Sequence, residues 1–435
     1  MSLFWLVLYN IVLIPLFWVG VMLASLFNRK IKEGIQCRRG WFRSLRNEMK
    51  RLDQNRKRVL FHCSSVGEWI QAVPIIEGIK NANPNIEIIV SFLSPSGYNF
   101  FKHHPDLAFK TYLPFDTRRN AMRFLGTIRP DIWVISKYDV WPNHMEAAKR
   151  LEIPVILISA LLSEKSGRDK GISGIFNRYI YQSFCCIFPV SEHDRKRFLK
   201  IYPFPNRLFV AGSTAFDSAY NRSLIVRAEE RIPIFKSRDE REVVFLGGSI
   251  WPSDAVHLIP ALIVVLNRFT HLKAILVPHE LHEQHIRDIE TALIDAGMKS
   301  RRYTEFSKTR GTQERIAIID TIGVLARLYR QSDIAYVGGS CGPGVHNVTE
   351  PAVFGQPVLF GPRYRNSFEA IELVNAGCGF MVDGKEELEG KLNQLIKDDA
   401  LRTNIGEKAL HLIKANVGAT DRILSVVRNR FEFVQ

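Results

Sequence analysis

Short apolar runs alternate with longer segments of helical character over most of the chain. Runs this rich in Val and Ile are typical of strands buried on both faces of a parallel sheet that helices cover. The predicted strands form two series: 58–63, 86–93, 131–136, 153–159, 186–191 and 207–213, and then 243–249, 272–278, 315–320, 333–339 and 357–361. The pattern therefore predicts an α/β protein with two doubly wound, Rossmann-like domains.

The two series also set the expected division of the chain. A charged, irregular stretch at 222–241 is interpreted as a linker between an N-terminal domain at 58–221 and a C-terminal domain at 242–415. Residues 416–435 are expected to form a C-terminal helix, which could return to the N-terminal domain. Open sheets of this kind bind ligands at the carboxyl ends of their strands, so the loops that follow the strands are the candidate sites.

The N-terminal segment 1–28 contains no charged side chain and is apolar from residue 3 to residue 27. A helix of about 20 apolar residues can span a bilayer. A cleaved signal peptide is the alternative, but its positive charge would precede the apolar run rather than follow it. We therefore predict a membrane anchor with the following chain on the cytoplasmic side, which Lys and Arg favour. Asn10 and Pro15 leave open a helix that lies in the interface or enters one leaflet.

The juxtamembrane segment 29–57 is strongly basic. The chain has a formal net charge of +15, and twelve Lys or Arg against three acids place +9 of it within residues 29–58. This position predicts contact with anionic headgroups at a membrane surface. No nucleic-acid partner is expected, because the basic segment lacks interleaved stacking aromatics. The six cysteines form no CxxC pair, which fits a reducing compartment.

The loop after the first predicted strand, at 62–69, reads HCSSVGEW. Small residues such as Ser65 and Gly67 let a ligand approach the backbone, and the amides of the helix that begins near Gly67 can hold an anion. Glu68 lies just inside this helix, where it could act as a general base. The alternative is an acid in the first helical turn that complements the helix dipole.

Lys137 and Asp139 follow the strand predicted at 131–136. They could contact a phosphate or a sugar acid, or they could form a surface ion pair. Ser163 and Ser166, in the later run 162–166, are typical loop and cap residues and indicate no particular chemistry.

Two segments of the second series could face a nucleotide. The Gly-rich turn at 247–252 suits a phosphate, but it lacks the spacing of a Walker A or dinucleotide motif. The segment VPHELHEQH at 277–285 contains Pro278, His279 and Glu280 together with two further histidines. It lacks HExxH spacing and a completing carboxylate or Cys, so no metal site is predicted.

The loop after 333–339 is the richest in candidate ligand groups. Ser340 follows a strand that ends in two glycines, and His346 and Asn347 precede a predicted helix. Asn347 can cap that helix and direct its amides toward a phosphate. Glu350 could accept hydrogen bonds from ribose hydroxyls, or it could be the acid of a capping box.

Several motifs occur together and in one order: HCSSVGEW, WPN, GSTAFD at 212–217, VP near 277, IGVLARLYRQSDIAYVGGS, HNVTEP and GQPVLFGP. In this the chain resembles the bacterial 3-deoxy-D-manno-octulosonic acid (Kdo) transferases, from the N-terminus to about residue 370. The resemblance implies a GT-B glycosyltransferase, whose two Rossmann-like domains face a central cleft, at the cytoplasmic face of the inner membrane. It also implies inverting transfer of Kdo from CMP-Kdo to a lipid A precursor in lipopolysaccharide synthesis, without a catalytic metal or other cofactor.

The resemblance places the general base at Glu68. The nucleotide-contacting positions implied by the resemblance fall on Pro278, His279, Ile322, Gly323, Val324, Asn347, Val348, Thr349 and Glu350. Ser65, Gly67, Glu280, Ser340 and His346 are assigned to the same substrate-binding set. Lys137 and Asp139 are assigned to the catalytic set with Glu68.

Four positions depart from the usual family pattern. Many members have ETE where this chain has Lys137-Tyr138-Asp139, a Lys at Ala215, an Arg at His279 and an acid at Val324. We interpret Lys137 as a replacement for the charge lost at Ala215, and His279 with Glu280 as a variant nucleotide contact. A GT-B transferase with another nucleotide-sugar donor is the alternative, as is a non-catalytic, membrane-tethered relative that binds glycolipid or nucleotide.

Overall fold

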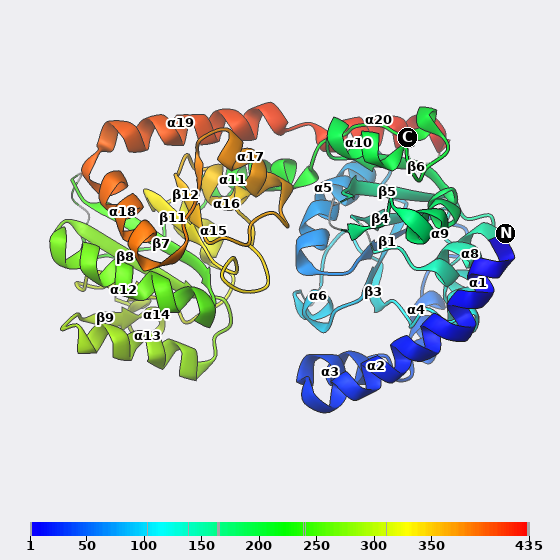
Figure 1. Ribbon diagram of the computed structural model, residues 1–435, viewed down its shortest axis with the longest axis horizontal. Helices are drawn as coiled ribbons and strands as arrows, with labels where there is room; N and C mark the ends of the chain where they lie inside the picture. Colours follow the sequence, from blue (N-terminus) through cyan, green and yellow to red (C-terminus); the bar gives the residue numbers. More distant parts are fainter. Residues whose placement is uncertain are drawn as a thin grey trace. The chain divides into compact units, whose positions relative to one another are not determined.

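Every paired strand of the chain is parallel, and the strands form two separate sheets. The computed structural model describes residues 2–101, 103–137, 139–162, 166–237, 239, 241–309 and 311–432. The chain divides into unit 1, Met1–Thr214 with Gly418–Gln435, and unit 2, Ala215–Val417 (Figure 1). The predicted pair of doubly wound α/β sheets is therefore confirmed.

The sheet of unit 1 has six strands in the order β3-β2-β1-β4-β5-β6. The strands are β1 (Arg58–Cys63), β2 (Glu87–Phe92), β3 (Phe109–Tyr112), β4 (Ile132–Ser136), β5 (Val155–Ala160) and β6 (Phe184–Pro189). The strand order reverses between β1 and β4, which makes the carboxyl ends of these two neighbours the switch point of the sheet.

Two sequence predictions for this sheet differ from the structure. The strand predicted at 207–213 is wrong. After a 3₁₀ turn, Pro205–Arg207, this segment makes an isolated bridge between Leu208 and Ile187 and a backbone hydrogen bond from Ala211 to Pro189, but it does not form a continuous ladder with β6. The edge strand β3 was not predicted. Its first three residues are only partly buried and include the polar Lys110 and Thr111, so the segment lacks the apolar run of a central strand.

Helices cover both faces of the unit 1 sheet. They are α5 (Val66–Ala82), α6 (Pro95–Asn99), α7 (Arg118–Ile128), α8 (Pro142–Arg150), α9 (Gly171–Tyr181) and α10 (Glu192–Phe198). Alternate residues of β1 point to opposite faces, so Leu60 belongs to one core and Phe61 to the other. The C-terminal helix α20 (Ala419–Arg430) belongs to unit 1, where its buried Ile423 and Leu424 join the same core as Phe61 and Trp69.

The N-terminal segment is mostly helical, with breaks at residue 28 and at residues 37–40. It comprises α1 (Ser2–Leu8), a π-helical turn η1 (Tyr9–Leu13), α2 (Ile14–Phe27), α3 (Arg29–Gln36) and α4 (Trp41–Met49). The stretch Phe4–Phe27 is long and apolar enough to cross a membrane, which makes it a candidate anchor. Asn28 redirects the chain into α3 by accepting hydrogen bonds from the amides of Lys30 and Ile31. The basic segment thus forms two helices, and Leu45 and Met49 of α4 are buried in the core.

The sheet of unit 2 has seven strands in the order β13-β12-β11-β7-β8-β10-β9. They are β7 (Val243–Ile250), β8 (Leu272–Pro278), β9 (Ser300–Arg302), β10 (Ile316–Ile318), β11 (Ile334–Val337), β12 (Val358–Phe360) and β13 (Gly379–Met381). The three-residue edge strands β9 and β13 were not predicted. Here the strand order reverses between β7 and β11, which are direct neighbours.

The helices of unit 2 follow the strands, as in unit 1. They are α11 (Thr214–Ala228), α12 (Pro252–Arg268), α13 (Glu283–Asp295), α14 (Tyr303–Phe306), α15 (Leu325–Tyr329), α16 (Thr349–Ala352), α17 (Phe368–Asn375), α18 (Gly384–Lys397) and α19 (Asp399–Asn416). The segment 222–241, expected to be a linker, lies inside unit 2. It begins within α11, and its Val226, Ile232 and Ile234 are buried, so these apolar side chains hold it against the second domain.

Candidate functional site

Glu68 lies at the switch point of the unit 1 sheet, in the first turn of the helix that follows β1. Ser65 is the N-cap of this helix, and its Oγ accepts a hydrogen bond from the amide of Glu68 at 3.4 Å. The loop of small residues between β1 and α5 lets the chain turn at once into the helix. The fold thus places a carboxylate beside the carboxyl ends of β1 and β4, where open α/β sheets bind ligands.

The Glu68 carboxylate is almost fully buried, with a relative exposure of 3% for the residue. It accepts hydrogen bonds from the Ser64 amide at 2.5 Å and from the Ser64 hydroxyl at 2.8 Å. Burial raises the pKa of Glu68 above its ordinary value, and the nearby Asp139 carboxylate adds to this rise, whereas Ser64 and Lys137 oppose it. Glu68 thus lies in the first helical turn, as an acid that complements the helix dipole does, but it is also buried with a raised pKa, which is common at functional sites.

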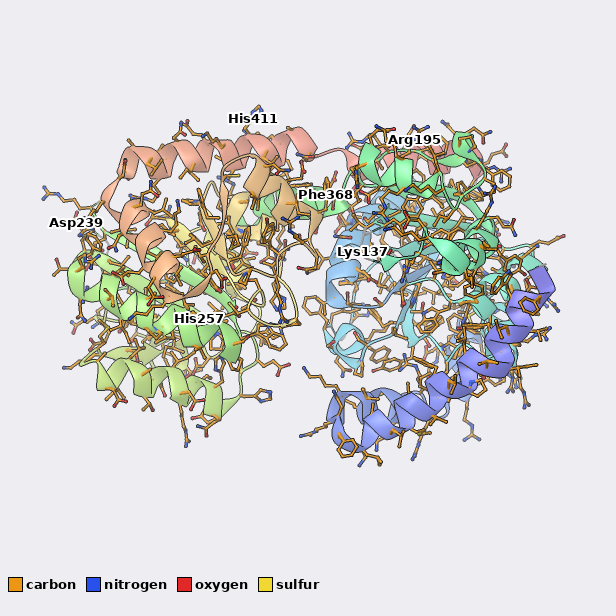
Figure 2. All side chains as sticks on the ribbon, viewed as in Figure 1. Lys137, Arg195, Asp239, His257, Phe368 and His411 are labelled. Atoms are coloured by element: carbon orange, nitrogen blue, oxygen red, sulfur yellow. The ribbon has the colours of Figure 1, made fainter. Side chains whose placement is uncertain are left out.

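Lys137 and Asp139, both expected near Glu68, follow the adjacent strand β4. Lys137 has a left-handed backbone with a φ of 62°, an uncommon conformation for a residue with a side chain, and it is labelled in Figure 2. The charge of Lys137 and that of Asp139 both act on the pKa of Glu68, so these three expected catalytic residues lie in one neighbourhood. Tyr138, between the two, lies outside the described residues.

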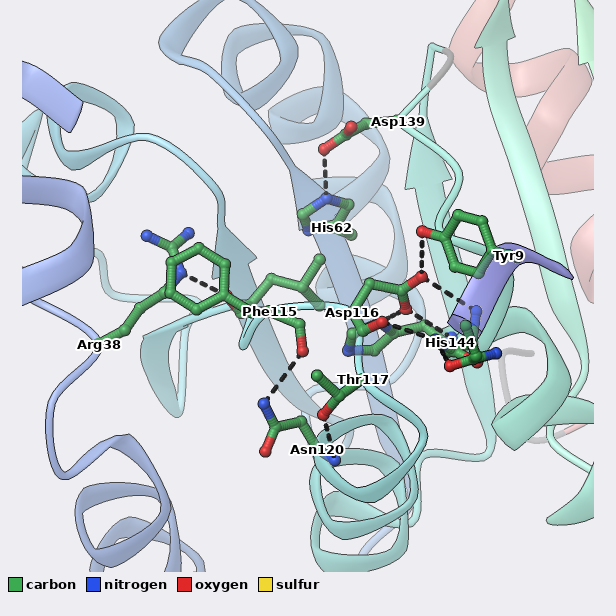
Figure 3. A network of polar contacts seen from close by, with 12 residues as sticks. Tyr9, Arg38, His62, Phe115, Asp116, Thr117, Asn120, Asp139 and His144 are labelled. Carbon is green, nitrogen blue, oxygen red and sulfur yellow. Dashed lines mark hydrogen bonds and ion pairs between the residues drawn. The ribbon is translucent and has the colours of Figure 1, made fainter. Parts of the chain in front are cut away.

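Asp139 is paired with His62 of β1. The Nε2 of His62 lies 2.8 Å from Asp139 Oδ2 (Figure 3). The Nδ1 of His62 lies 3.0 Å from the Ser91 hydroxyl of β2. The side chain of His62 is fully buried, whereas that of Asp139 is 17% exposed. The sequence analysis missed the role of His62, although it quoted this residue within the motif that contains Glu68.

In unit 2, three aromatic rings stack at the carboxyl edge of the sheet. Trp251 follows β7, His279 follows β8, and His346 lies in the loop after β11. The ring centroids of Trp251 and His279 are 4.5 Å apart with an interplanar angle of 15°, and those of His279 and His346 are 4.4 Å apart at 27°. Loops after three neighbouring strands therefore meet at the switch point between β7 and β11.

The protonation state of His346 follows from its partner. The indole Nε1 of Trp251 donates a hydrogen bond of 2.7 Å to His346 Nε2, so this nitrogen is an acceptor and the proton of a neutral ring is on Nδ1. Burial lowers the pKa of His346 to about 4, and His279 adds to the decrease. His346 is thus neutral at pH 7, and its Nδ1–H has no hydrogen-bond partner among the described residues.

A buried carboxylate, Asp254, organises the loops around this stack. It accepts hydrogen bonds from the amides of Trp251, Gly339 and Cys341 and from the Tyr336 hydroxyl. Two backbone segments pack so closely here that a Cβ added at Gly338 would lie 2.1 Å from a backbone oxygen of the other segment. The sequence analysis missed both Asp254 and Trp251. The Trp–Pro pair that precedes α12, with an acid three residues after the Trp, was the available signal.

Asn347 was expected to cap the helix that follows it, but the N-cap of the short helix α16 is Val348, and Asn347 lies one residue before it. The Oδ1 of Asn347 accepts hydrogen bonds from the Thr349 amide at 3.2 Å and the Thr349 hydroxyl at 2.6 Å. Its Nδ2 also donates to Glu350 at 3.2 Å, and burial raises the pKa of Glu350. This helix spans only four residues, so the extended helix end expected to direct amides at a phosphate is not formed. Val348 and Thr349 are buried.

The remaining expected binding residues lie at the same edge of the sheet in different environments. Ser340 is buried, and its hydroxyl accepts a hydrogen bond from the Gly361 amide at 2.5 Å. Glu280 lies beside Pro278 and His279 and bonds His282 at 2.8 Å. Ile322, Gly323 and Val324 form the turn between β10 and α15, and Ile322 is 82% exposed. Among the described residues, no group of three or more His, Cys, Asp or Glu could hold a metal ion.

Comparisons with known proteins agree with this architecture. Residues 34–218 match the family model of the 3-deoxy-D-manno-octulosonic-acid transferases. The chain is 24% identical over 380 residues to the 3-deoxy-D-manno-octulosonic acid transferase of Haemophilus influenzae, covering 86% of this chain and 87% of that protein. It is 24% identical over 434 residues to the enzyme of that name from Rickettsia bellii, covering 97% and 98%.

The fold is similar to that of UDP-GlcNAc 2-epimerase from Neisseria meningitidis, solved bound to UDP-GlcNAc. The TM-score is 0.62 at 15% identity, with 86% of this chain and 100% of that chain covered. A putative UDP-N-acetylglucosamine 2-epimerase from Listeria monocytogenes gives a TM-score of 0.59 at 15% identity, with 87% and 97% covered. The sequence matches confirm the expected resemblance, and the structural likeness confirms the GT-B type of fold.

The network around Asp254 yields a test of the unit 2 site. In Asp254→Asn, one carboxylate oxygen becomes an NH₂ group that faces backbone N–H donors, at a cost of about 1–3 kcal/mol for each donor left unsatisfied. We expect faster amide hydrogen exchange in residues 338–350, measured by mass spectrometry, and a lower free energy of unfolding. Asp288→Asn, at an exposed position of α13, is the matched control. Unchanged exchange in the Asp254 variant would contradict the assignment of Asp254 as the residue that holds these loops.

Proposed function

Because this chain is a glycosyltransferase of the GT-B type, related over most of its length to the 3-deoxy-D-manno-octulosonic acid transferases, we propose that it transfers Kdo from CMP-Kdo to a lipid A precursor. Glu68 is the general base of this reaction. The observation that supports the assignment is the position of Glu68: a buried carboxylate with a raised pKa, at the switch point of the unit 1 sheet, with Lys137 and Asp139 acting on it.

The proposed reaction follows from the properties of this carboxylate. Glu68 removes the proton of an acceptor hydroxyl, whose oxygen attacks the anomeric carbon of Kdo. The bond from that carbon to the phosphate oxygen breaks, CMP leaves as an anion, and the configuration at the anomeric carbon inverts. The proton remains on Glu68 until it passes to solvent. A base with a pKa raised toward neutrality can accept and return a proton more readily than an ordinary carboxylate.

The remaining charged and polar groups fit the supporting roles. Lys137, next to Glu68, supplies positive charge where negative charge develops. His62 holds the Asp139 carboxylate through a 2.8 Å contact, which fixes a second negative charge near the base. In unit 2, the planar stack of Trp251, His279 and His346 offers an aromatic surface for the cytosine base, and the Nδ1–H of His346 offers a hydrogen-bond donor.

The acceptor and the location are proposed from the N-terminal helices. The exposed cations of α3, α4 and the residues next to these helices follow directly on the apolar helix. They are Arg29, Lys30, Lys32, Arg39, Arg43, Arg46 and Lys50. A phosphorylated glycolipid in an anionic membrane complements this combination of charge and apolar surface. We therefore place the protein at the cytoplasmic face of the bacterial inner membrane, with no nucleic-acid partner.

A different nucleotide-sugar donor is the second candidate. It is favoured by the uncharged or weakly basic side chains Ala215, His279 and Val324 at positions where the resemblance leads one to expect charges. A donor screen separates the two candidates, because consumption of a UDP- or GDP-sugar with CMP-Kdo inert would select the second.

Replacement of the proposed base gives the first test of transfer. Glu68→Gln keeps the size of the side chain but cannot take up the proton, so we expect transfer from CMP-Kdo to tetra-acylated lipid A precursor to fall by about 10²–10⁴-fold. Glu77→Gln, on the same helix α5, is the matched control and should retain activity. Products are identified by mass spectrometry, and CMP binding is measured by calorimetry. A Glu68→Gln variant with normal turnover would contradict the base assignment.

The pH dependence gives a second test. Only ionised Glu68 can act as the base, and its folded-state pKa is raised above the ordinary 4.5. In a plot of kcat/KM against pH, the acidic limb is therefore expected above pH 4.5. The activity should fall as the pH decreases through the pKa of Glu68. Glu77→Gln should keep the same limb. A limb at or below the ordinary carboxyl pKa, in protein shown to be folded by circular dichroism, would exclude Glu68 as the group that titrates.

Metal removal gives a third test. We propose that cationic side chains and backbone amides stabilise the departing phosphate without a resident metal or other cofactor. Transfer should then persist at an unchanged rate in EDTA. A loss of activity that Mg²⁺ restores would show that the reaction needs a cation.

A further inference from the structure

The apolar N-terminal helix makes polar contacts with unit 1. The Tyr9 hydroxyl donates a hydrogen bond to Asp116 Oδ2 at 2.8 Å (Figure 3). Asn10 and Asn143 exchange side-chain hydrogen bonds of 2.9 and 3.0 Å. Both Tyr9 and Asn10 lie in the π-helical turn η1, the least regular part of the segment. These contacts fix the middle of the apolar run to the protein.

Aromatic contacts extend this attachment along the helix. Trp5 and Tyr9 pack against Phe176 of α9, with ring centroids 6.1 and 6.0 Å apart. Trp18 of α2 packs against Phe115 at 4.4 Å. On other positions of the same helix large apolar side chains are exposed, including Ile11 at 69% and Leu16 at 63%. One side of the helix is therefore attached to unit 1, while the other presents hydrocarbon to its surroundings.

A cavity of about 310 Å³ lies between this helix and the body of unit 1. Its volume falls within the range of roughly 300–1,000 Å³ that ligand pockets occupy. The lining is mostly apolar and includes Ile14, Val21 and Ile31 from the helices. The opposite wall comes from loops after β2, β3 and β4, and includes Leu93 and Phe115.

The cavity also contains a buried cation. Arg38, with 6% exposure, donates to the carbonyl oxygens of Leu113 at 2.8 Å, Gly34 at 2.7 Å and Leu93 at 2.5 Å. The remaining N–H groups of the Arg38 guanidinium take no part in these hydrogen bonds. No carboxylate of the described residues forms an ion pair with Arg38. The charge of Asp139 acts on Arg38 from beyond ion-pair distance, and a buried cation without a paired carboxylate favours an anionic ligand.

The other polar groups of the lining agree with this charge preference. Asp116 is the carboxylate of the lining, and it already accepts from Tyr9, from the amides of Asn143 and His144, and from His144 Nδ1 at 2.6 Å. Asp116 is thus already hydrogen-bonded within the protein. Trp141 is another lining residue, and its buried indole N–H has no partner among the described residues.

The cavity adjoins the loop of the proposed base. Leu93 lines it, and the amide of the next residue, Ser94, donates to the carbonyl of Ser64 at 3.1 Å. Ser64 in turn holds the Glu68 carboxylate. A lipid with its chain in the cavity would therefore present its headgroup at the carboxyl edge of this sheet.

We propose that this cavity binds one acyl chain of the phosphorylated lipid acceptor, with the N-terminal helix as its outer wall. The helix then lies along unit 1 in one leaflet and does not cross the bilayer. This inference rests on the proposed function for the identity of the lipid, whereas the site itself requires only an anionic amphiphile.

The site is tested by filling it. In the full-length protein, kept in detergent-free amphipol, we expect dodecyl phosphate to bind, dodecanol to bind more weakly and inorganic phosphate not to compete. Val21→Trp, which fills the cavity, should weaken dodecyl phosphate binding by about tenfold or more, because methylenes lose their burial. Val19→Trp, at an exposed position of the same helix, is the matched control and should bind as the wild type does.

A second variant and a transfer assay complete the test. Asn10→Leu keeps the helix apolar but removes its hydrogen bonds to Asn143, and it should also weaken binding of the probe. Val21→Trp should raise the KM for acylated acceptor and leave the KM for CMP-Kdo unchanged. Unchanged probe binding in Val21→Trp, or equal affinity for dodecanol and dodecyl phosphate, would overturn the site. Probe binding without any transfer by the wild type would instead contradict the proposed function and leave the cavity as an amphiphile site.

Discussion

The parallel arrangement of both sheets is the constraint on which the rest of the structure depends. A parallel strand can be followed by another only through a crossover, so every loop that leaves a strand emerges at one edge of the sheet. At the reversal of strand order, two such loops diverge and leave room between them. Glu68 and Asp139 occupy this position in unit 1, and Trp251 and His346 occupy it in unit 2. Residues distant in sequence meet there because of topology rather than local sequence.

Buried carboxylates perform two different tasks at these edges. Asp116 and Asp254 each accept four hydrogen bonds from separate segments, which compensates the cost of burying their charge and ties loops together. Glu68 has donors from Ser64 alone and a like charge nearby, and its pKa is raised. The number of hydrogen-bond donors thus distinguishes the structural carboxylates Asp116 and Asp254 from Glu68, the proposed base.

The long apolar strands could be predicted from the sequence because they depend on local patterns. Glu68, Lys137 and Asp139 could be expected near one another because Glu68 follows one predicted strand, and Lys137 and Asp139 follow another. Central strands such as β1 and β4 are buried on both faces, and most of their residues are apolar. The edge strand β3 has no run of apolar residues, and the apolar segment at 207–213 is not a strand, because burial there is not accompanied by a ladder. The ring stack of unit 2 was missed because no spacing links Trp251, His279 and His346.

The N-terminal helix shows how polar residues decide between two arrangements that composition permits equally. A helix across a bilayer would expose the Tyr9 hydroxyl and the Asn10 amide to hydrocarbon, where each unpaired polar group costs several kcal/mol, on the order of 2–7. Attached to unit 1, both groups are hydrogen-bonded, to Asp116 and Asn143. The exposed apolar side of the same helix still needs hydrocarbon, which a single leaflet provides. In the proposed single-leaflet arrangement, the cations after residue 28 would lie at the level of the headgroups.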